Sequence, residues 1–243
     1  MSAMAETVAV PAALPGLRVA EPTPPPAGLR RLHQLASAAV AMAFPQGPVV
    51  ALPPFGTAPA ARAWLDAELP TLLAVPDPAF ARRLAPVLAG YLAATGRHLE
   101  AAELFARALV AGGGPAERIR LAGALTRIGW HEQAAEQYRA ASLDDPDALT
   151  DLGLALFRLE RYDEARAVFA RVLDRSRARG DGFAEGAALV GIGACHQRQG
   201  HHLQALAWHT EAYWVCTRAG CEPGRADASR GIRAATAGLP RPL

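Results

Sequence analysis

The sequence predicts an all-α protein in which helical hairpins repeat along the chain. Strands rich in Val, Ile and Thr with alternating polarity are hard to find, and the chain is dominated by Ala and Leu and is 51% hydrophobic. In addition, one spaced template of small and aromatic residues recurs four times. With 243 residues, the chain is long enough to bury a sizeable core.

The N-terminal part of the chain is divided by prolines. Residues 1–26 are rich in Ala and Pro without periodicity, and we expect them to form a tail. Residues 27–78 are expected to form N-terminal helices around a Pro-rich connection. The individual expectations are a helix from Gly28 to about Phe44, a connection over 44–59, a helix from about Ala60, and a helix start at Asp77-Pro78.

Four turn positions define the repeat. They are Gly96, Gly129, Glu160 and Gly200, and they are spaced 33, 31 and 40 residues apart. A small residue follows each turn by five positions and a ring follows by nine. The small residues are Ala101, Ala134, Ala165 and Ala205, and the rings are Phe105, Tyr138, Phe169 and His209. Each copy therefore predicts two helices that cross closely at the small residue, with the ring filling the adjoining gap.

The sequence also predicts the conformation of the turns and the length of the last helices. Glycine suits the left-handed conformation that ends many helices. Because an L-residue there costs roughly 1–2 kcal/mol, we expect a different turn geometry at Glu160. The interval of 40 implies longer helices near the C-terminus. We place the solenoid over 79–238, with a capping helix at about Arg225–Ala235 and a short tail over 239–243.

The template resembles the tetratricopeptide repeat, and the likeness covers about residues 82–220 in four copies. It departs from that family at Gly113, Arg177 and Thr217, where the family often has the proline that Pro146 supplies. The resemblance implies an α-solenoid whose hairpins stack into a right-handed superhelix. Whether the N-terminal helices extend the solenoid or fold across its end is left open.

A second resemblance precedes the repeats. The order RRLHQLASAAVAMAFP, LPPFG and ARAWLDAELPTLLAV is similar to the C-terminal half of actinobacterial transcriptional regulators of the antibiotic-regulatory and NB-ARC ATPase type, mainly at Trp64-Leu65-Asp66-Ala67-Glu68. In that family a winged-helix module and an ATPase come before the repeats. We expect this chain to lack both and to be the sensor or scaffold half alone, since no GxxxxGK[ST] occurs.

Composition narrows the function classes. All 25 basic residues are Arg, and the missing Lys excludes a Walker-A loop, a Schiff-base lysine and a Ser-Lys dyad. The net charge of +2 gives little support for direct nucleic-acid binding. Three cysteines without CxxC suit reduced thiols in the cytoplasm. We expect no cofactor, no membrane span and no cleaved leader.

Arginines near the turns are the candidate binding residues. Arg127, Arg158 and Arg198 each lie two residues before a turn, and on stacked first helices they would form a ladder along the concave groove, joined by Arg120. Guanidinium groups bind carboxylates in bidentate fashion, so the ladder predicts a partner with acidic or carboxylate groups. Asp151 would select the opposite charge or pair with these arginines. The alternative is that each Arg only complements a helix dipole.

The last copy is rich in Cys and His. His196 replaces the Leu of the other copies and His209 replaces Phe or Tyr, so the two imidazoles would mark a pocket. The alternative is buried histidine satisfied by its neighbours. The spacing argues against a metal site, since paired CxxC and HxxxH motifs are absent.

These patterns favour a non-catalytic module that binds a peptide or protein in its groove, in a regulatory or biosynthetic-cluster context. The alternative function is a small-molecule sensor or an unusual enzyme that uses the Cys/His-rich last repeat. No GxSxG is present and HEQAA at His131 lacks the second His of a zincin, so no catalytic residue is assigned. The sequence identifies neither the partner nor the oligomeric state.

Overall fold

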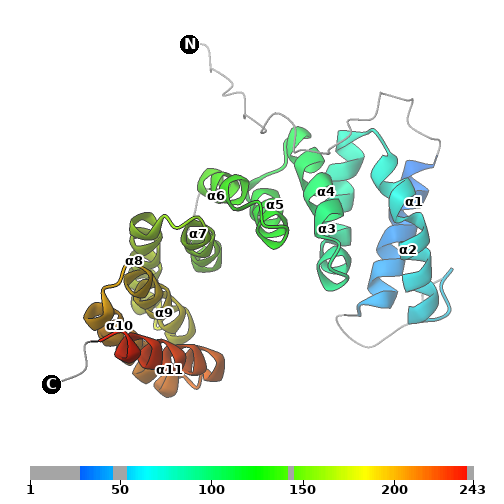
Figure 1. The fold of residues 1–243 in the computed structure, drawn as a ribbon. Helices are drawn as coiled ribbons and strands as arrows, with labels where there is room; N and C mark the ends of the chain where they lie inside the picture. Colours follow the sequence, from blue (N-terminus) through cyan, green and yellow to red (C-terminus); the bar gives the residue numbers. More distant parts are fainter. Residues whose placement is uncertain (1–27, 46–53, 142–144, 240–243) are drawn as a thin grey trace, which may run out of the picture. The chain divides into compact units, whose positions relative to one another are not determined.

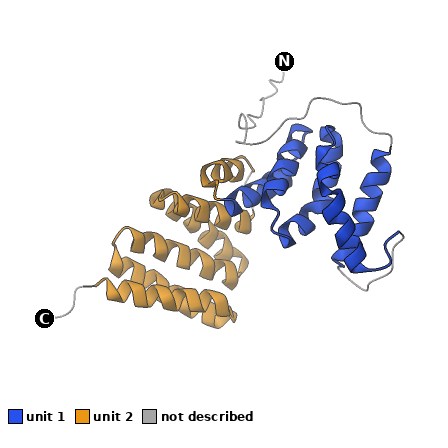
Figure 2. Cartoon of the chain, turned by 45° about the vertical axis from the view of Figure 1, so that its right-hand side comes forward, with its two compact units in different colours: residues 1–128 blue, residues 129–243 orange. Residues whose placement is uncertain are grey.

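The computed structural model describes residues 28–45, 54–141 and 145–239, which form eleven α-helices and no strand (Figure 1). The all-α prediction is confirmed for these residues. The expected tail over 1–26 and half of the Pro-rich connection over 44–59, residues 46–53, lie outside the described residues. The helices fall into two compact units, residues 1–128 and 129–243 (Figure 2).

The first unit holds five helices arranged as consecutive hairpins. They are α1 (Leu29–Ala43), α2 (Ala58–Ala74), α3 (Pro78–Ala94), α4 (His98–Val110) and α5 (Pro115–Arg127). Helix α1 packs against α2 and also against α3, while α4 packs against α3 and α5. Helices α1 and α3, the first helices of the first two hairpins, are therefore neighbours.

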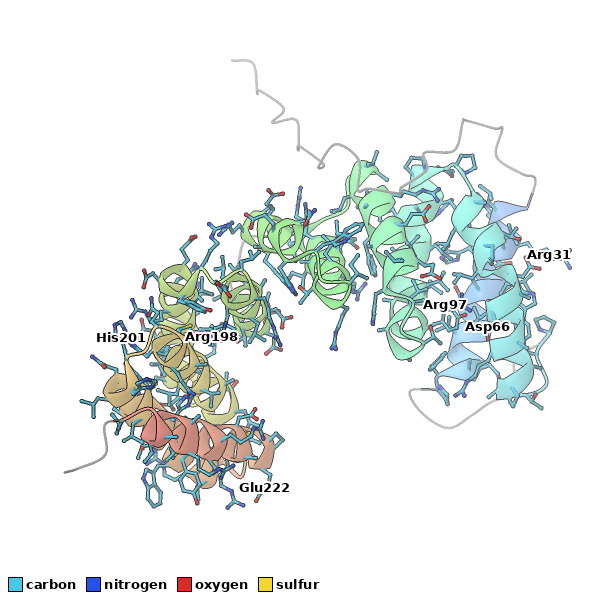
Figure 3. All side chains as sticks on the ribbon, in the orientation of Figure 1. Arg31, Asp66, Arg97, Arg198, His201 and Glu222 are labelled. Carbon is cyan, nitrogen blue, oxygen red and sulfur yellow. The ribbon has the colours of Figure 1, made fainter. Side chains whose placement is uncertain are left out.

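Polar contacts fix the same unit at its helix ends. Arg107 of α4 donates hydrogen bonds to the carbonyl groups of Leu73 and Val75 at the end of α2. The Tyr91 hydroxyl, on α3, donates to Asp66 at 2.6 Å, and Arg97 pairs with the same carboxylate at 2.9 Å (Figure 3). Carbonyls at a helix end have no partner within the helix, so Arg107 supplies the missing donor.

The second unit holds six helices, which are longer toward the C-terminus. They are α6 (His131–Ala140), α7 (Pro146–Arg158), α8 (Tyr162–Arg179), α9 (Gly182–Arg198), α10 (His202–Ala219) and α11 (Glu222–Ala237). The interval of 40 residues thus corresponds to longer helices, as predicted. Each helix packs against the next, and α9 also packs against α7 and α11. Helices α7, α9 and α11 therefore form one layer of this unit.

Local sequence explains where these helices begin. Asp77, Asp145 and Asp181 each accept a hydrogen bond from a backbone amide at the start of the following helix. Proline occupies the first position of α3, α5 and α7, where its missing amide hydrogen would have no partner within the helix. The predicted start at Asp77-Pro78 is confirmed, and the last helix begins three residues before the expected Arg225.

The small residues of the template are all buried. Ala101 is 5% exposed, and Ala134, Ala165 and Ala205 are 0% exposed. None points into solvent, so the expectation that these positions lie in helix–helix seams is confirmed. The rings nine residues after each turn are buried as well.

The turn at Glu160 corrects one expectation. Gly96, Gly129 and Gly200 have φ values of 70°, 86° and 78°, and Glu160 adopts the same left-handed conformation with φ 59°. The expected different geometry is wrong because the backbone bonds of the turn dominate. The Glu160 amide donates to Phe157 at 3.1 Å and the Arg161 amide to Leu156 at 3.0 Å, which satisfies carbonyls at the end of α7.

Replacing Glu160 with glycine is therefore expected to raise the free energy of unfolding by about 1 kcal/mol, because it relieves the left-handed strain. The variant loses an exposed ion pair with Arg198 at 3.4 Å, and such pairs contribute little. Urea unfolding measures the change. Gly200→Ala is the matched control and should lower the free energy of unfolding. An added methyl group at Gly200 meets no atom within 4 Å, so the left-handed backbone strain is the expected cause of the loss.

Candidate functional site

In the second unit, rings are held between glycines of two successive first helices. A methyl group on Gly153 of α7 would lie 2.6 Å from the Phe169 ring, and one on Gly191 of α9 would lie 2.8 Å from the same ring. Phe169 projects from α8, so its ring fills the space between α7 and α9. The absence of a side chain at both glycines lets the three helices approach one another around the ring.

His209 occupies the equivalent place one repeat later. Its ring lies against Gly193 of α9, where a methyl group would be 2.8 Å away, and against Gly231 of α11, where a methyl group would overlap it. His209 is only 2% exposed, and neither ring nitrogen has a hydrogen-bond partner. Burial lowers the pKa of His209, because the charged imidazolium loses its water. The ring is therefore a neutral filler in an apolar seam.

His196 lies in a different environment. It is half-buried near the end of α9, its Nδ1 is 3.4 Å from Arg166, and its ring centroid is 5.8 Å from that of His201. Burial and the nearby Arg166 charge lower its pKa. The contacts of His196 are thus Arg166 and His201, whereas His209 contacts glycines. The pocket assigned to both histidines from the sequence stays a prediction.

The exposed face of α7 and α9 carries the candidate binding residues of the second unit. Asp151, Leu154 and Arg158 lie at helical spacing on one face of α7, and all three are exposed. On α9, Phe183 at the start of the helix and Arg198 at its end are both exposed, with Phe183 57% exposed. Arg158 and Arg198 occupy equivalent template positions on adjacent helices, so this unit places two of the predicted arginines in neighbouring repeats.

These residues differ in how they are engaged. Arg198 pairs with Glu160 and lies 5.9 Å from the Tyr162 ring, while its side chain stays 56% exposed (Figure 3). Asp151 accepts a hydrogen bond from the Tyr138 hydroxyl at 3.1 Å. Within the described part of the chain, Arg158 makes no hydrogen bond or ion pair. Arg158 is therefore the arginine of this face with the greatest freedom to bind an external group.

Arg120 and Arg127 belong to the first unit. Both are exposed on α5, with Arg127 in its last turn. Neither forms an ion pair with a described residue. Their place in a common ladder with Arg158 and Arg198 stays a prediction.

The sequence did not reveal the glycine seats, meaning the pairs of glycines that flank the Phe169 and His209 rings: Gly153 with Gly191, and Gly193 with Gly231. The signal was present, since Gly191-Ile192-Gly193 places two glycines on opposite sides of one helix, nine and seven residues before the Gly200 turn. Seven residues before the other turns are Ala89, Ala122 and Gly153. The sequence shows that these positions are small, but only the packing shows which ring each of them receives.

Two further features are absent from the described residues. No three His, Cys, Asp or Glu side chains among them are close enough together to hold a metal ion. No described helix is long and apolar enough to cross a membrane.

Part of the chain matches one protein family. Residues 144–216 match the model of the tetratricopeptide repeat, and this range includes all of α7, α8 and α9 and most of α10. Among solved structures, the chain is similar to BtubC (BKLC) from P. vanneervenii, with a TM-score of 0.49 and 18% sequence identity over 90% of this chain and 96% of that one. No curated protein matches the sequence.

Proposed function

We propose that the tetratricopeptide hairpins of this chain bind a protein partner, and that the exposed face of α7 and α9 captures an acidic peptide segment of it. Repeats of this kind generally mediate protein–protein interaction. The observation that carries the proposal is Arg158, which is exposed and makes no hydrogen bond or ion pair within the described residues, beside Leu154, which is 46% exposed. A guanidinium next to an apolar side chain suits a carboxylate flanked by an aliphatic residue.

Arg198 is proposed as the second carboxylate donor of this face. Its ion pair with Glu160 is long and open to water, so a peptide carboxylate can replace Glu160 at little cost. Phe183, more than half exposed on α9, offers apolar contact area to the same segment. Arg120 and Arg127 are proposed to play the same role on α5, and Asp151 to favour a basic residue of the partner.

The setting we propose is a cytoplasmic regulatory or biosynthetic-cluster protein. The regulatory part rests on the likeness of residues 30–75 to the regulator family. The cytoplasmic part is supported by three cysteines that form no disulfide.

Selection of a displayed random-peptide library on the immobilised full chain tests the proposal. We expect the selected peptides to be enriched in Asp, Glu or free C-terminal carboxylates next to aliphatic residues. The double variant Arg158→Ala/Arg198→Ala should weaken a selected peptide by at least about a hundredfold, since two lost charge-assisted hydrogen bonds are worth about 1.5–3 kcal/mol each and 1.4 kcal/mol is tenfold in affinity. Fluorescence anisotropy measures the affinity.

Arg171→Ala/Arg218→Ala is the matched control. Both arginines are exposed, lie on α8 and α10, and have no ion pair among the described residues, so this variant removes the same charge from different helices. Equal weakening by the two double variants would show that only net charge matters. Peptides without carboxylates, or full affinity in Arg158→Ala/Arg198→Ala, would overturn the proposal.

A further inference from the structure

The turn between α10 and α11 brings two cysteines together. Cys216 lies in the last turn of α10, and Cys221 follows Gly220, which has φ 71°. The Cys221 amide donates a hydrogen bond to the Cys216 carbonyl at 2.8 Å. This six-residue bond is the mark of a Schellman turn, a helix ending in which the first and last side chains come into contact. Here both of those side chains are thiols.

The backbone bond also limits the distance between the two residues. Standard peptide dimensions and the 2.8 Å bond keep the two Cα atoms within roughly 7 Å of each other, and disulfides form below that limit. The turn therefore meets the backbone requirement for a disulfide without rearranging either helix.

The sulfur atoms themselves are neighbours. A methyl group placed on Gly224 of α11 would lie 2.7 Å from the Cys216 sulfur and 3.1 Å from the Cys221 sulfur. Both sulfur atoms therefore lie close to the same position beside α11. Cys195, the third cysteine, is buried on α9, and Arg166 and Asp163 are the charged groups that act on it.

The two thiols differ in access. Cys216 is buried, and a methyl group on Gly186 of α9 would overlap its sulfur, whereas Cys221 is partly exposed. Burial, together with the adjacent Cys221 thiol, raises the pKa of Cys216 to about 11. An oxidant in solution therefore reaches Cys221 first, and Cys216 is placed to react second.

From this geometry we propose that Cys216 and Cys221 form a redox-active dithiol that closes to a disulfide with low-molecular-weight disulfides such as oxidised glutathione. The Cys221 thiolate attacks one glutathione sulfur, and the first glutathione leaves as its thiolate. Cys216 then attacks the Cys221 sulfur of the mixed disulfide, and the second glutathione leaves and takes up the Cys216 proton. Two protein thiols are oxidised to one disulfide, and one oxidised glutathione is reduced to two thiols.

The reaction modifies the junction between the last hairpin and α11. In the reduced chain the Cys216 sulfur fills the space between Gly186 of α9 and Gly224 of α11. The disulfide draws this sulfur toward Cys221, so oxidation changes the packing of α9, α10 and α11 at one point. The dithiol lies at the α10–α11 turn and is independent of the face proposed to bind a peptide.

Mass spectrometry of the full chain tests the proposal. The reduced protein is incubated with oxidised glutathione, quenched with acid, alkylated and digested with trypsin, which cleaves at Arg218 between the two cysteines. We expect the intact mass to fall by about 2 Da and the peptides 199–218 and 219–225 to remain joined until a reductant is added. Peptides that contain Cys195 should carry the alkyl group.

Single variants distinguish the two roles. Cys216→Ser should keep a stable glutathione adduct of about 305 Da on Cys221, and Cys221→Ser should stay unmodified because its remaining thiol of the pair is buried. Cys195→Ser should still lose about 2 Da. A stable adduct on the unchanged chain, linkage through Cys195 or between two chains, or no reaction at all would each overturn the proposal.

Discussion

Replacing Gly191 with alanine is expected to lower the free energy of unfolding by about 1–3 kcal/mol, the usual range for overpacking a filled core. The new methyl group would lie 2.8 Å from three atoms of the Phe169 ring. The ring cannot move away from the new methyl group, because Gly153 of α7 lies on its other side. A methyl group on Gly153 would be only 2.6 Å from the ring. Helix α9 must therefore move away from α8 or the ring must leave its preferred rotamer. Urea unfolding followed by circular dichroism measures the loss.

The sign of this change distinguishes packing from helix propensity. Alanine in a helix interior is normally about 1 kcal/mol better than glycine. Gly90→Ala is the matched control, since Gly90 is exposed in the interior of α3 and an added methyl group meets no atom within 4 Å. Gly90→Ala should stabilise while Gly191→Ala destabilises. Stabilisation by both changes would mean that the glycine seat of Phe169 is not close-packed.

Replacing His209 with phenylalanine is expected to raise the free energy of unfolding by about 1–2 kcal/mol at neutral pH. The change removes two buried ring nitrogens that have no hydrogen-bond partner, and each such group costs about 1–3 kcal/mol. Phenylalanine should fit, because Gly193 and Gly231 flank His209 as Gly153 and Gly191 flank Phe169. His201→Phe is the matched control. Because His201 is exposed, its ring nitrogens can bind water, and this change should leave the stability nearly unchanged.

The same variant should alter the pH dependence of stability. Burial holds the pKa of folded His209 below its unfolded value of about 6.5, so the unfolded chain binds more protons as the pH falls below that value. The unchanged protein should therefore lose up to about 1.4 kcal/mol per pH unit from this residue, down to the folded pKa. His209→Phe should lose less between pH 6.5 and 5. An unchanged pH slope would show that His209 is not buried in the neutral form.

The sequence predicted the repeat well because its signals are local. Turn positions, small residues and rings at fixed offsets follow from helix geometry, and α2, α3 and α7 begin close to their capping residues. The conformation of Glu160 was missed, since residue preference argued against a geometry that the backbone bonds impose. The glycine seats and the paired thiols depend on which helices meet in space, and spacing along one chain does not specify that.

The packing of Gly231 of α11 against the His209 ring has a practical consequence for protein engineering. Gly231 of α11 receives the ring of His209 in the way that Gly191 of α9 receives Phe169. A second copy of residues 182–221, inserted after Cys221, would offer its own glycine to His209 and its own imidazole to α11. The ends of the hairpin thus match at His209 but not at Cys216, because the copy would place Ala184 where Gly224 adjoins the Cys216 sulfur. A tandem duplication therefore also needs glycine at that position of the copy.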